Sequence, residues 1–289
     1  MRAFYQIILL ASIMVCAAFH WDGRVAVTQR RFSLHMSEGR EGRERVSVFD
    51  TPEEVGGEVC REILAMAKAE IALKGSFFLA VPGGSVLKLL APLKDAADAV
   101  DWSKVYLFYV NHKCVPDDDP TSTHFKAQHL FLNAIQCNAF PPGAGAGAPG
   151  AGVDEGQMQI QKGHNTDAHL YAAHLQMLPT GSKGSLPTFD YMLLGVGKDG
   201  HIGSLYPGGK DLYSDEWVVA VDRKSPSSIT LTLPVINNAK TIRIVMMGGD
   251  KAEAVRCGVT KAKAVAEFPV CGVEGEVRWI VDAPSARLL

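Results

Sequence analysis

The stretch Leu193–Pro207 reads LLGVGKDGHIGSLYP. An apolar run at residues 189–194 leads into it and has the length and composition of a buried strand. The glycines that follow surround one aspartate, Asp199, and one histidine, His201. In open parallel sheets, ligands bind beyond the carboxyl ends of the strands, where glycines let backbone approach a ligand and a histidine can exchange protons near neutral pH. The stretch therefore predicts an α/β protein with its site in this loop; the structural alternative is a plain glycine turn with a structural histidine.

Strand-like and helix-like segments alternate on both sides of this loop. Thr51 can cap a helix, because Glu54 completes a capping box, and Gly75 ends the apolar repeat of that helix. Further helices are expected at residues 87–93, 122–132, 248–266 and from 166 onward. Strands are expected at residues 46–49, 76–81, 105–110, 189–194, 217–221, 241–247 and 277–281, with a further β-rich run at 229–234. This alternation predicts a parallel sheet flanked by helices.

Composition and charge favour small-molecule chemistry in a folded domain. The chain has 289 residues, of which 47% are hydrophobic and 21% charged, and its formal net charge is -2. No basic stripe interleaved with aromatic residues is present beyond the N-terminus, so a nucleic-acid partner is not expected. The six cysteines are widely spaced and form no C-x-x-C pair, which fits a reducing compartment better than a disulfide framework.

Residues 1–45 have the composition of a targeting leader. Arg2 precedes an apolar run at residues 7–19, which is typical of a signal peptide and too short to span a membrane comfortably. An arginine-rich, acid-poor segment follows and resembles a transit peptide, so the whole is similar to the bipartite leaders of proteins imported into plastids of secondary endosymbiotic origin, with Phe19 at the junction. We expect a plastid protein without a membrane segment in its mature form; the alternatives are a secreted, membrane-anchored or cytosolic protein.

Residues 46–289 are expected to form one domain. Residues 140–152 are a low-complexity Gly/Ala/Pro segment that cannot bury enough apolar surface to become ordered. We interpret this segment as a flexible surface insertion and not as a domain boundary.

A second glycine loop, Gly83-Gly84-Ser85, stands between an expected strand and an expected helix. Convergent amides, the helix dipole and the serine hydroxyl make this a phosphate-binding nest, although the same pattern also describes a tight turn with an N-cap.

No metal or cofactor is expected. The acidic run 117–119 lacks further ligands at fixed spacing. His164, His169 and His174 recur in steps of five, which turn about 140° on a helix, so these histidines cannot share one face.

Several motifs in the same order resemble the 6-phosphogluconolactonase family, which shares its fold with glucosamine-6-phosphate deaminases. The resemblance runs from Val46 to the C-terminus and implies a Rossmann-like parallel sheet flanked by helices. The motifs are Gly83-Gly84-Ser85, Val115-Pro116 with Asp118-Asp119-Pro120, Gly195-x-Gly197-x-Asp199-Gly200-His201, Ser204-Leu205-Tyr206-Pro207-Gly208, Thr230 through Asn237, and Lys251 through Val255. The deaminases continue the D-G-H motif with F-N-E-P, so the S-L-Y-P of this chain points to the lactonase branch.

The resemblance implies hydrolysis of 6-phospho-D-glucono-1,5-lactone in the oxidative pentose phosphate pathway, a reaction that needs no cofactor. Lactone hydrolysis requires a base that takes a proton from water and donors that hold the oxyanion. The implied base is His201, and Asp199 either orients it or shapes the turn. Gly195, Gly197 and Gly200 keep backbone amides accessible to that oxyanion.

The implied phosphate contacts are the Gly83, Gly84 and Ser85 nest with the cations Lys113 and Lys251. The chain departs from the family pattern in two places. Lactonases usually carry D-E-R after the third strand, where this chain has Asn111-His112-Lys113, and an arginine where it has Ser228. Lysine keeps the charge of arginine but loses its bidentate geometry.

Two hypotheses follow from these departures. In the first, the chain is a lactonase whose phosphate contacts are rebuilt with Lys113 and Lys251 and with either His112 or Lys210. In the second, it is a non-catalytic sugar-phosphate-binding or regulatory protein, or a lactonase-like enzyme with a changed substrate. The oligomeric state does not follow from the sequence.

Overall fold

The computed structural model describes residues 45–141, 164–180 and 186–289, and these residues contain the expected parallel sheet flanked by helices. All pairs in this seven-stranded sheet are parallel. Its strands, in spatial order, are β1 (Arg45–Phe49), β10 (Val277–Asp282), β9 (Ile242–Met246), β6 (Tyr191–Gly195), β2 (Phe77–Val81), β3 (Val105–Tyr109) and β5 (Asn138–Ala139). Six of these strands lie within two residues of their predicted positions, and β5 is the one that the sequence does not predict.

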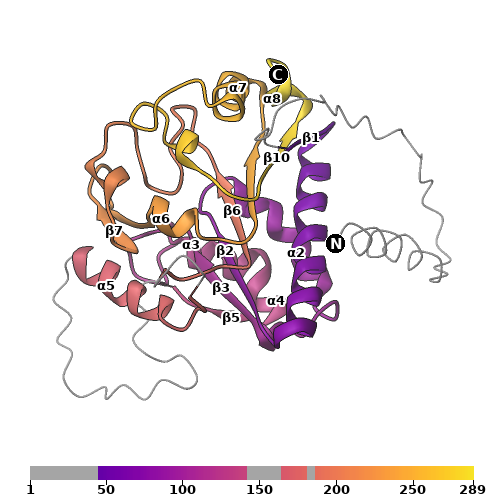
Figure 1. Cartoon of the computed structure of the whole chain (residues 1–289). Coiled ribbons are helices and arrows are strands. Elements are labelled where there is room, and N and C mark those ends of the chain that lie inside the picture. The colour runs from indigo at the N-terminus through magenta and orange to yellow at the C-terminus, as the bar shows by residue number, and fades with distance from the viewer. Residues whose placement is uncertain (1–44, 142–163, 181–185) are drawn as a thin grey trace, which may run out of the picture. The chain divides into compact units, whose positions relative to one another are not determined.

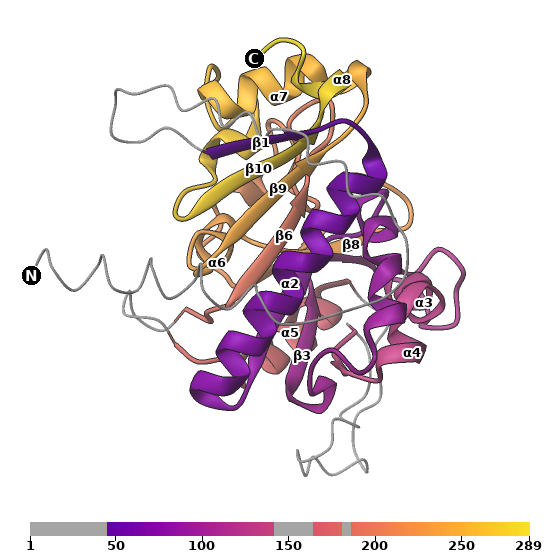
Figure 2. The ribbon, with the colours of Figure 1, turned by 90° about the vertical axis from the view of Figure 1, so that its right-hand side faces the viewer.

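Each face of the sheet is covered by helices, because successive strand residues point to opposite faces. In β2, Phe77, Leu79 and Val81 join one core, whereas Phe78 and Ala80 join the other. The first core is closed by α2 (Pro52–Lys74), η1 (Val86–Ala96) and the run α3 (Thr123–Ala127), η3 (Gln128–Leu132) and α4 (Asn133–Ile135). The second is closed by α5 (His164–Leu175), α6 (Leu233–Ile236), α7 (Ala252–Thr260) and η6 (Pro269–Gly272). Figures 1 and 2 show α2 lying across its face of the sheet.

Local sequence signals set the long helix α2. The Thr51 hydroxyl accepts from the Glu54 amide at 3.2 Å, and the Glu54 carboxylate accepts from the Thr51 amide at 3.3 Å, so the predicted capping box is formed. Gly75 ends the helix with φ +83°, and its amide donates to the Ile71 carbonyl at 2.9 Å. A left-handed residue costs glycine no Cβ clash, which explains why the helix ends there.

Other predicted helices differ in type or length. The segment after Ser85 is an 11-residue 3₁₀ helix that contains Pro92. Ser122 caps its helix as predicted, by accepting from the Phe125 amide at 3.3 Å. The helix predicted to reach residue 266 ends at Thr260, because Lys261 takes the left-handed conformation with φ +50°. The remaining short helices are η2 (Trp102–Lys104), η4 (Lys210–Tyr213), η5 (Gly249–Lys251) and α8 (Ala283–Ala286).

The first two residues of the predicted flexible insertion at residues 140–152 are buried parts of the fold, which corrects the prediction for these two residues. Phe140 is buried and stacks on Phe108, with ring centroids 4.9 Å apart. Residues 142–152 and the leader, residues 1–44, lie outside the described residues, so their assignments stay predictions. His174 is half-buried against Phe140 and Tyr171 and not on the surface, whereas His169 is exposed as expected.

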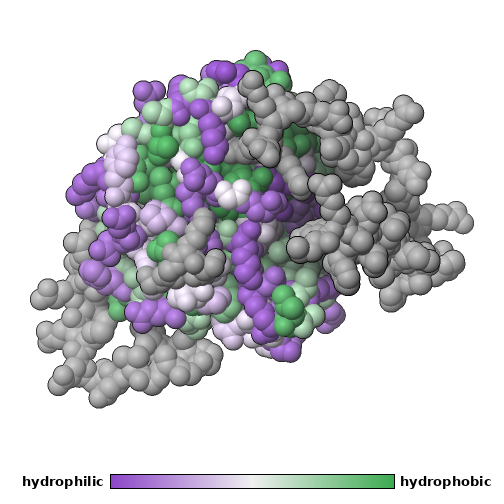
Figure 3. All heavy atoms as spheres, viewed as in Figure 1, coloured by the Kyte–Doolittle hydropathy of each residue, from purple (hydrophilic) through white to green (hydrophobic). Residues whose placement is uncertain are grey.

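The surface of the described residues is mixed in hydropathy. Figure 3 shows hydrophilic residues spread between smaller hydrophobic areas on the face that it presents. In the part of the chain that the structure describes, no helix combines the length and the apolar character that crossing a membrane requires. The cysteines of the described residues are all unpaired.

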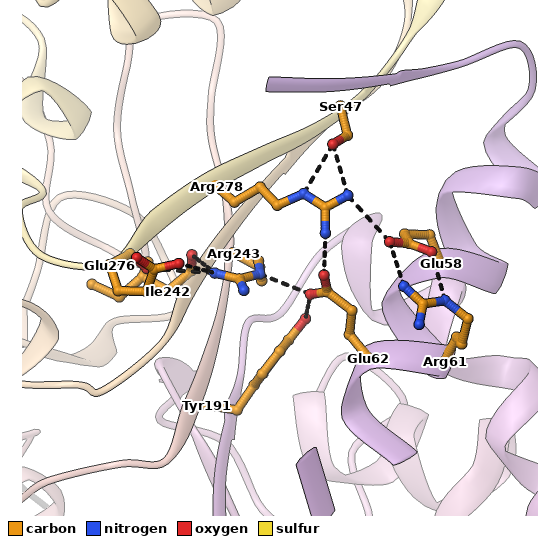
Figure 4. A network of polar contacts seen from close by, with 9 residues as sticks. All are labelled: Ser47, Glu58, Arg61, Glu62, Tyr191, Ile242, Arg243, Glu276 and Arg278. Carbon is orange, nitrogen blue, oxygen red and sulfur yellow. Dashed lines mark hydrogen bonds and ion pairs between the residues drawn. The ribbon is translucent and has the colours of Figure 1, made fainter. Parts of the chain in front are cut away.

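A network of ion pairs ties α2 to the amino ends of the strands (Figure 4). Glu62 accepts from Arg243 at 2.7 Å, from the Tyr191 hydroxyl at 3.2 Å and from Arg278. Arg278 also donates to Glu58 at 3.2 Å. Arg243 and Arg278 are opposite each other in the register of β9 and β10. The single carboxylate of Glu62 therefore pairs with arginines on two adjacent strands. This network lies at the end of the sheet away from the glycine loops.

A second sheet, which the sequence does not predict, stands beside the first. It is antiparallel and consists of β4 (Asn111–Lys113), β8 (Ser228–Leu231) and β7 (Val218–Val221), in the order β4-β8-β7. The strands predicted at residues 217–221 and 229–234 therefore do not join the parallel sheet, which corrects the expectation of one sheet. In the register of β4 and β8, Lys113 is directly opposite Ser228.

His112 lies in the middle of β4 and is 1% exposed. Its Nδ1 is 2.7 Å from the Lys113 carbonyl oxygen and donates to it, so its Nε2 accepts from the Ser122 hydroxyl and the His124 amide, both at 3.2 Å. Burial lowers the pKa of His112 to about 4. Because both ring nitrogens are engaged and the ring is 1% exposed, His112 has no group left for a phosphate, so the role that the sequence left open for His112 is wrong.

The pKa of His112 predicts an acid-sensitive fold. The folded value of about 4 lies below the value of about 6.5 expected in the unfolded chain, which therefore binds the proton first as the pH falls. The contribution of His112 to the free energy of unfolding is fully present above pH 6.5 and is lost toward pH 4. This contribution amounts to at most about 3 kcal/mol.

The measurement is the free energy of unfolding in urea at pH 7 and pH 4.5 for residues 45–289. We expect His112→Gln to be less stable than the wild type at pH 7, by about 1 to 3 kcal/mol for the lost buried hydrogen bonds, and to lose less stability on acidification. The exposed His129→Gln is the matched control and keeps the wild-type pH dependence. An unchanged pH dependence in His112→Gln contradicts the assignment.

Candidate active site

Four neighbouring strands deliver the predicted site residues to one edge of the parallel sheet. In the order β9-β6-β2-β3, their carboxyl ends lead into residues 248–251, 195–201, 83–85 and 111–113. The carboxyl ends of parallel strands meet at one edge, which is where open α/β sheets bind ligands. The structure thus brings His201 and Asp199, the nest Gly83-Gly84-Ser85, and the loops of Lys113 and Lys251 to the same edge.

Direct contacts join these loops. A Cβ on Gly195 would lie 2.8 Å from Cγ2 of Val86, so the His201 loop packs closely against the start of η1. Lys198 forms an ion pair with Asp250 at 2.6 Å, which connects the loop after β6 with the loop that carries Lys251. This pair is exposed, so it contributes little to stability.

His201 and Asp199 form a hydrogen-bonded pair within their loop. Asp199 Oδ1 lies 2.6 Å from His201 Nδ1 and also accepts from the His201 amide at 3.3 Å. An ionised carboxylate only accepts, so Nδ1 carries the hydrogen and Nε2 of the neutral ring is left with a free lone pair. Burial acts to raise the pKa of Asp199, but the hydrogen bond and charge of His201 outweigh it and hold this pKa below its usual value.

Two glycines give the His201 ring its place. A Cβ on Gly197 would lie 2.0 Å from His201 Nδ1, so any other residue would displace the ring. Gly200 has φ +80°, and a Cβ there would lie 2.4 Å from the ring of Phe268. Only glycine satisfies the backbone angle and the space at this position.

The glycine amides are less available than the sequence suggests. The Gly197 amide donates to the His201 carbonyl at 2.9 Å, and the Gly200 amide donates to the Gly197 carbonyl at 3.0 Å. Both amides therefore stabilise the turn itself. The expectation that they are free donors for an oxyanion is wrong for Gly197 and Gly200.

The nest has the features of an anion site. Gly84 has φ +77°, Gly84 and Ser85 are exposed, and the Ser85 side chain makes no capping hydrogen bond. The first amides of η1 have no acceptor within that helix. The Gly83 amide is already used, because it donates to Asn111 Oδ1 at 3.3 Å.

Asn111, Ser204 and Ser228 form a neutral hydrogen-bonded chain beside the nest. Asn111 Nδ2 donates to Ser204 Oγ at 3.2 Å, and Ser228 Oγ donates to the same oxygen at 2.8 Å. The Ser204 amide donates to Thr230 Oγ1 at 3.1 Å, and Ser204 is 2% exposed. Because Ser204 Oγ accepts twice, its own hydrogen is left for another acceptor.

Two residues near His201 carry no role in the sequence prediction. They are Ser204 and Tyr206, whose ring centroid is 4.8 Å from that of His201. The only sequence signal was their place in the S-L-Y-P-G motif, because their partners come from distant parts of the chain.

The two predicted cations have different settings. Lys113 lies opposite Ser228 and is half-buried. Lys251 caps the amino end of α7 and is also half-buried. Among the residues that the structure describes, neither forms an ion pair with a carboxylate. Both are therefore available to an anionic ligand.

Among the described residues, no group of three or more His, Cys, Asp or Glu side chains is placed to hold a metal ion. In the acidic run, Asp119 accepts from the Thr121 amide at 2.6 Å and so shapes a turn. Burial and then the charge of Asp118 raise the pKa of Asp117.

Comparison with known proteins places these observations in a family. The family model described as glucosamine-6-phosphate isomerases/6-phosphogluconolactonase matches residues 50–281. The chloroplastic 6-phosphogluconolactonase 3 of Arabidopsis thaliana is 30% identical over 262 residues, covering 87% of this chain and 77% of the relative. A 6-phosphogluconolactonase of Mycobacterium bovis is 30% identical over 239 residues, covering 79% and 92%.

A solved structure, the 6-phosphogluconolactonase of Trypanosoma brucei, is similar with a TM-score of 0.68 and 25% identity, covering 86% of this chain and 99% of that one. The family match and the similar fold confirm the resemblance found in the motifs. The chain belongs to the glucosamine-6-phosphate isomerase/6-phosphogluconolactonase family.

Proposed function

We propose that this chain hydrolyses 6-phospho-D-glucono-1,5-lactone to 6-phosphogluconate, a step of the oxidative pentose phosphate pathway. The relatives are named 6-phosphogluconolactonases, which are lactone hydrolases, and this supports the assignment of the chain to this type of enzyme. The single observation that carries the proposal is the His201–Asp199 pair at 2.6 Å, with Nε2 free, at the sheet edge that also holds the nest.

In the proposed mechanism, His201 is the general base. Its Nε2 takes a proton from water as the water oxygen bonds to C1 of the lactone, and the carbonyl electrons move onto the C1 oxygen. When the tetrahedral intermediate collapses, the bond between C1 and the ring oxygen breaks, and that oxygen takes the proton back from the imidazolium. The ionised Asp199 stabilises the imidazolium and holds the ring orientation.

The substrate's phosphate is held, in this proposal, by the Gly83-Gly84-Ser85 nest with Lys113 and Lys251. The first amides of η1 and the free Ser85 hydroxyl supply hydrogen bonds, and the lysines supply charge. Gly195, Gly197 and Gly200 make room for Val86, the His201 ring and Phe268, so in this proposal they shape the loop that presents His201 to the lactone. The free hydrogen of Ser204 supplies a neutral donor at the same edge.

We further propose that the chain works in a plastid. Relatives in Arabidopsis thaliana and Oryza sativa are named chloroplastic, and residues 1–45 have the composition of a bipartite leader.

Residues 1–45 fused to a fluorescent protein are expected to deliver it to the plastid, and fluorescence in the medium would contradict this.

A changed substrate or a non-catalytic sugar-phosphate-binding role is the second candidate. The neutral chain Asn111–Ser204–Ser228 favours it, because two of these residues stand where the lactonase pattern has charged side chains. The two candidates differ in whether acid is released from the lactone faster than in buffer.

The first prediction concerns His201. Residues 45–289 added to freshly made 6-phospho-D-glucono-1,5-lactone are expected to release acid well above the spontaneous rate. His201→Ala is expected to lower kcat by about 10² to 10⁴, because the base is lost. The exposed His169→Ala is the matched control. If wild type, control and His201→Ala all equal the buffer rate, the hydrolase proposal is wrong; binding of 6-phosphogluconate in a thermal-shift assay then supports the second candidate.

The second prediction concerns Asp199. Asp199→Asn is expected to lower kcat by about 10-fold or more with little change in KM, because an amide can turn its NH₂ toward Nδ1 and stabilise the wrong tautomer. Because the pKa of Asp199 lies below its usual value, the wild-type carboxylate stays ionised across the neutral range. The exposed Asp98→Asn is the control. An unchanged kcat in Asp199→Asn would remove Asp199 from the mechanism.

The third prediction concerns Lys113. Lys113→Ala is expected to raise KM by about 10-fold or more, because a charge-assisted contact to a phosphate is worth roughly 1.5 to 3 kcal/mol. Lys113→Arg is expected to restore the wild-type KM or improve on it, since guanidinium binds phosphate with two hydrogen bonds. Lys126→Ala, a nearby exposed lysine, serves as control. Equal KM values for all three variants would place the phosphate elsewhere.

A further inference from the structure

The ring of Tyr206 joins His201 to two cations. The ring centroids of Tyr206 and His201 are 4.8 Å apart. The Lys224 ammonium lies 4.6 Å from the Tyr206 centroid, and the Arg223 guanidinium carbon lies 5.2 Å from it. The Tyr206 ring thus contacts both the proposed base and two positive groups.

Arg223 and Lys224 lie over the Tyr206 ring without an ion pair to a carboxylate of the described residues. The recorded hydrogen bond of Arg223 goes to the Pro207 carbonyl at 2.8 Å, which anchors the side chain without cancelling its charge. Among the residues that the structure describes, neither Arg223 nor Lys224 forms an ion pair with a carboxylate. Two like charges on one ring repel each other, so an anion bound between them is favoured.

Arg223, but not Lys224, borders a hollow of about 320 Å³. Tyr206 and Arg223 form part of its lining, together with Lys210, Asp211 and Asp222. Because Asp211 and Asp222 give this lining a mixed charge, positive charge is concentrated where Arg223 and Lys224 lie over the Tyr206 ring. Arg223 and Lys224 lie in residues 222–227, which connect β7 to β8 and so lead into Ser228.

The chemistry of the proposed reaction distinguishes what these cations can bind. His201 acts at C1, where the lactone is neutral and the product is a carboxylate. The phosphate is at C6 and is the same in both. Cations next to C1 therefore stabilise the product and not the substrate.

We propose that Arg223 and Lys224, held over Tyr206, form a carboxylate subsite that binds C1 of the hydrolysed product. This proposal rests on the proposed function, because it takes C1 to lie at His201. The subsite sets how strongly the product inhibits the enzyme.

The kinetic test compares product inhibition with substrate affinity in residues 45–289. In the double variant Arg223→Gln/Lys224→Gln, the Ki of 6-phosphogluconate is expected to rise about fivefold, a factor typical of losing exposed charge contacts. The KM of the lactone is expected to stay within about twofold. Lys263→Gln is the matched control, because Lys263 also lies over an aromatic ring, that of Phe268, at 5.4 Å. An unchanged Ki, or Ki and KM rising together, overturns the proposal; the second outcome places the phosphate there.

A binding test stands independently of catalysis. Thermal stabilisation of the wild type by 6-phosphogluconate is expected to exceed that by D-glucitol 6-phosphate, which has the same phosphate and no carboxylate. The double variant is expected to lose this difference and to keep the response to D-glucitol 6-phosphate. If the wild type does not hydrolyse the lactone but shows the difference, the proposed function fails and the subsite stands. If the two ligands stabilise the wild type equally, the subsite is wrong.

Discussion

The parallel pairing of β2 with β6 is the constraint on which the site depends. It aligns Leu79 with Tyr191 and Ala80 with Met192, and it joins the β2-β3-β5 part of the sheet to the β6-β9-β10-β1 part. Without this pairing, the nest after β2 and the histidine loop after β6 would not share an edge. At the other end of the sheet, Glu62 neutralises arginines on β9 and β10 and ties them to α2. The fold thus places the Glu62 network at one end of the sheet, whereas Lys113 and Lys251 at the other end form no ion pair within the described residues.

The geometry of the candidate site depends on glycines as much as on its functional side chains. The His201 ring occupies the space that a Cβ on Gly197 would fill, and Asp199 then fixes which nitrogen carries the hydrogen. The amides of Gly197 and Gly200 are consumed in holding this turn. The same amides therefore cannot also be the oxyanion donors, so the proposed mechanism depends on Nε2 of His201 and on donors from neighbouring strands.

Local signals in the sequence predicted much of this arrangement, and long-range contacts account for what they missed. The capping box at Thr51, the strand before Gly195 and the loop to His201 each depend on residues close in sequence, and each was predictable. The strand β4 is short and polar, so it has no hydrophobic pattern, and it exists because it pairs with β8. His112 was an open candidate for phosphate binding because its burial depends on Ser122 and His124, which pack on it only in the folded chain.

The register of β4 and β8 changes the meaning of the departures from the lactonase pattern. Lys113 and Ser228 are opposite each other, and Asn111 and Ser228 both donate to Ser204, so these substitutions belong to one connected group. An arginine at position 228 would be next to Lys113 and close in sequence to Lys224, so three cations would share a small area. The neutral hydroxyl of Ser228 relieves that repulsion. Positive charge is then concentrated on the chain segment just before β8, where Arg223 and Lys224 lie over Tyr206, whose ring contacts His201, and this is the charge that we propose to act at C1 of the ligand.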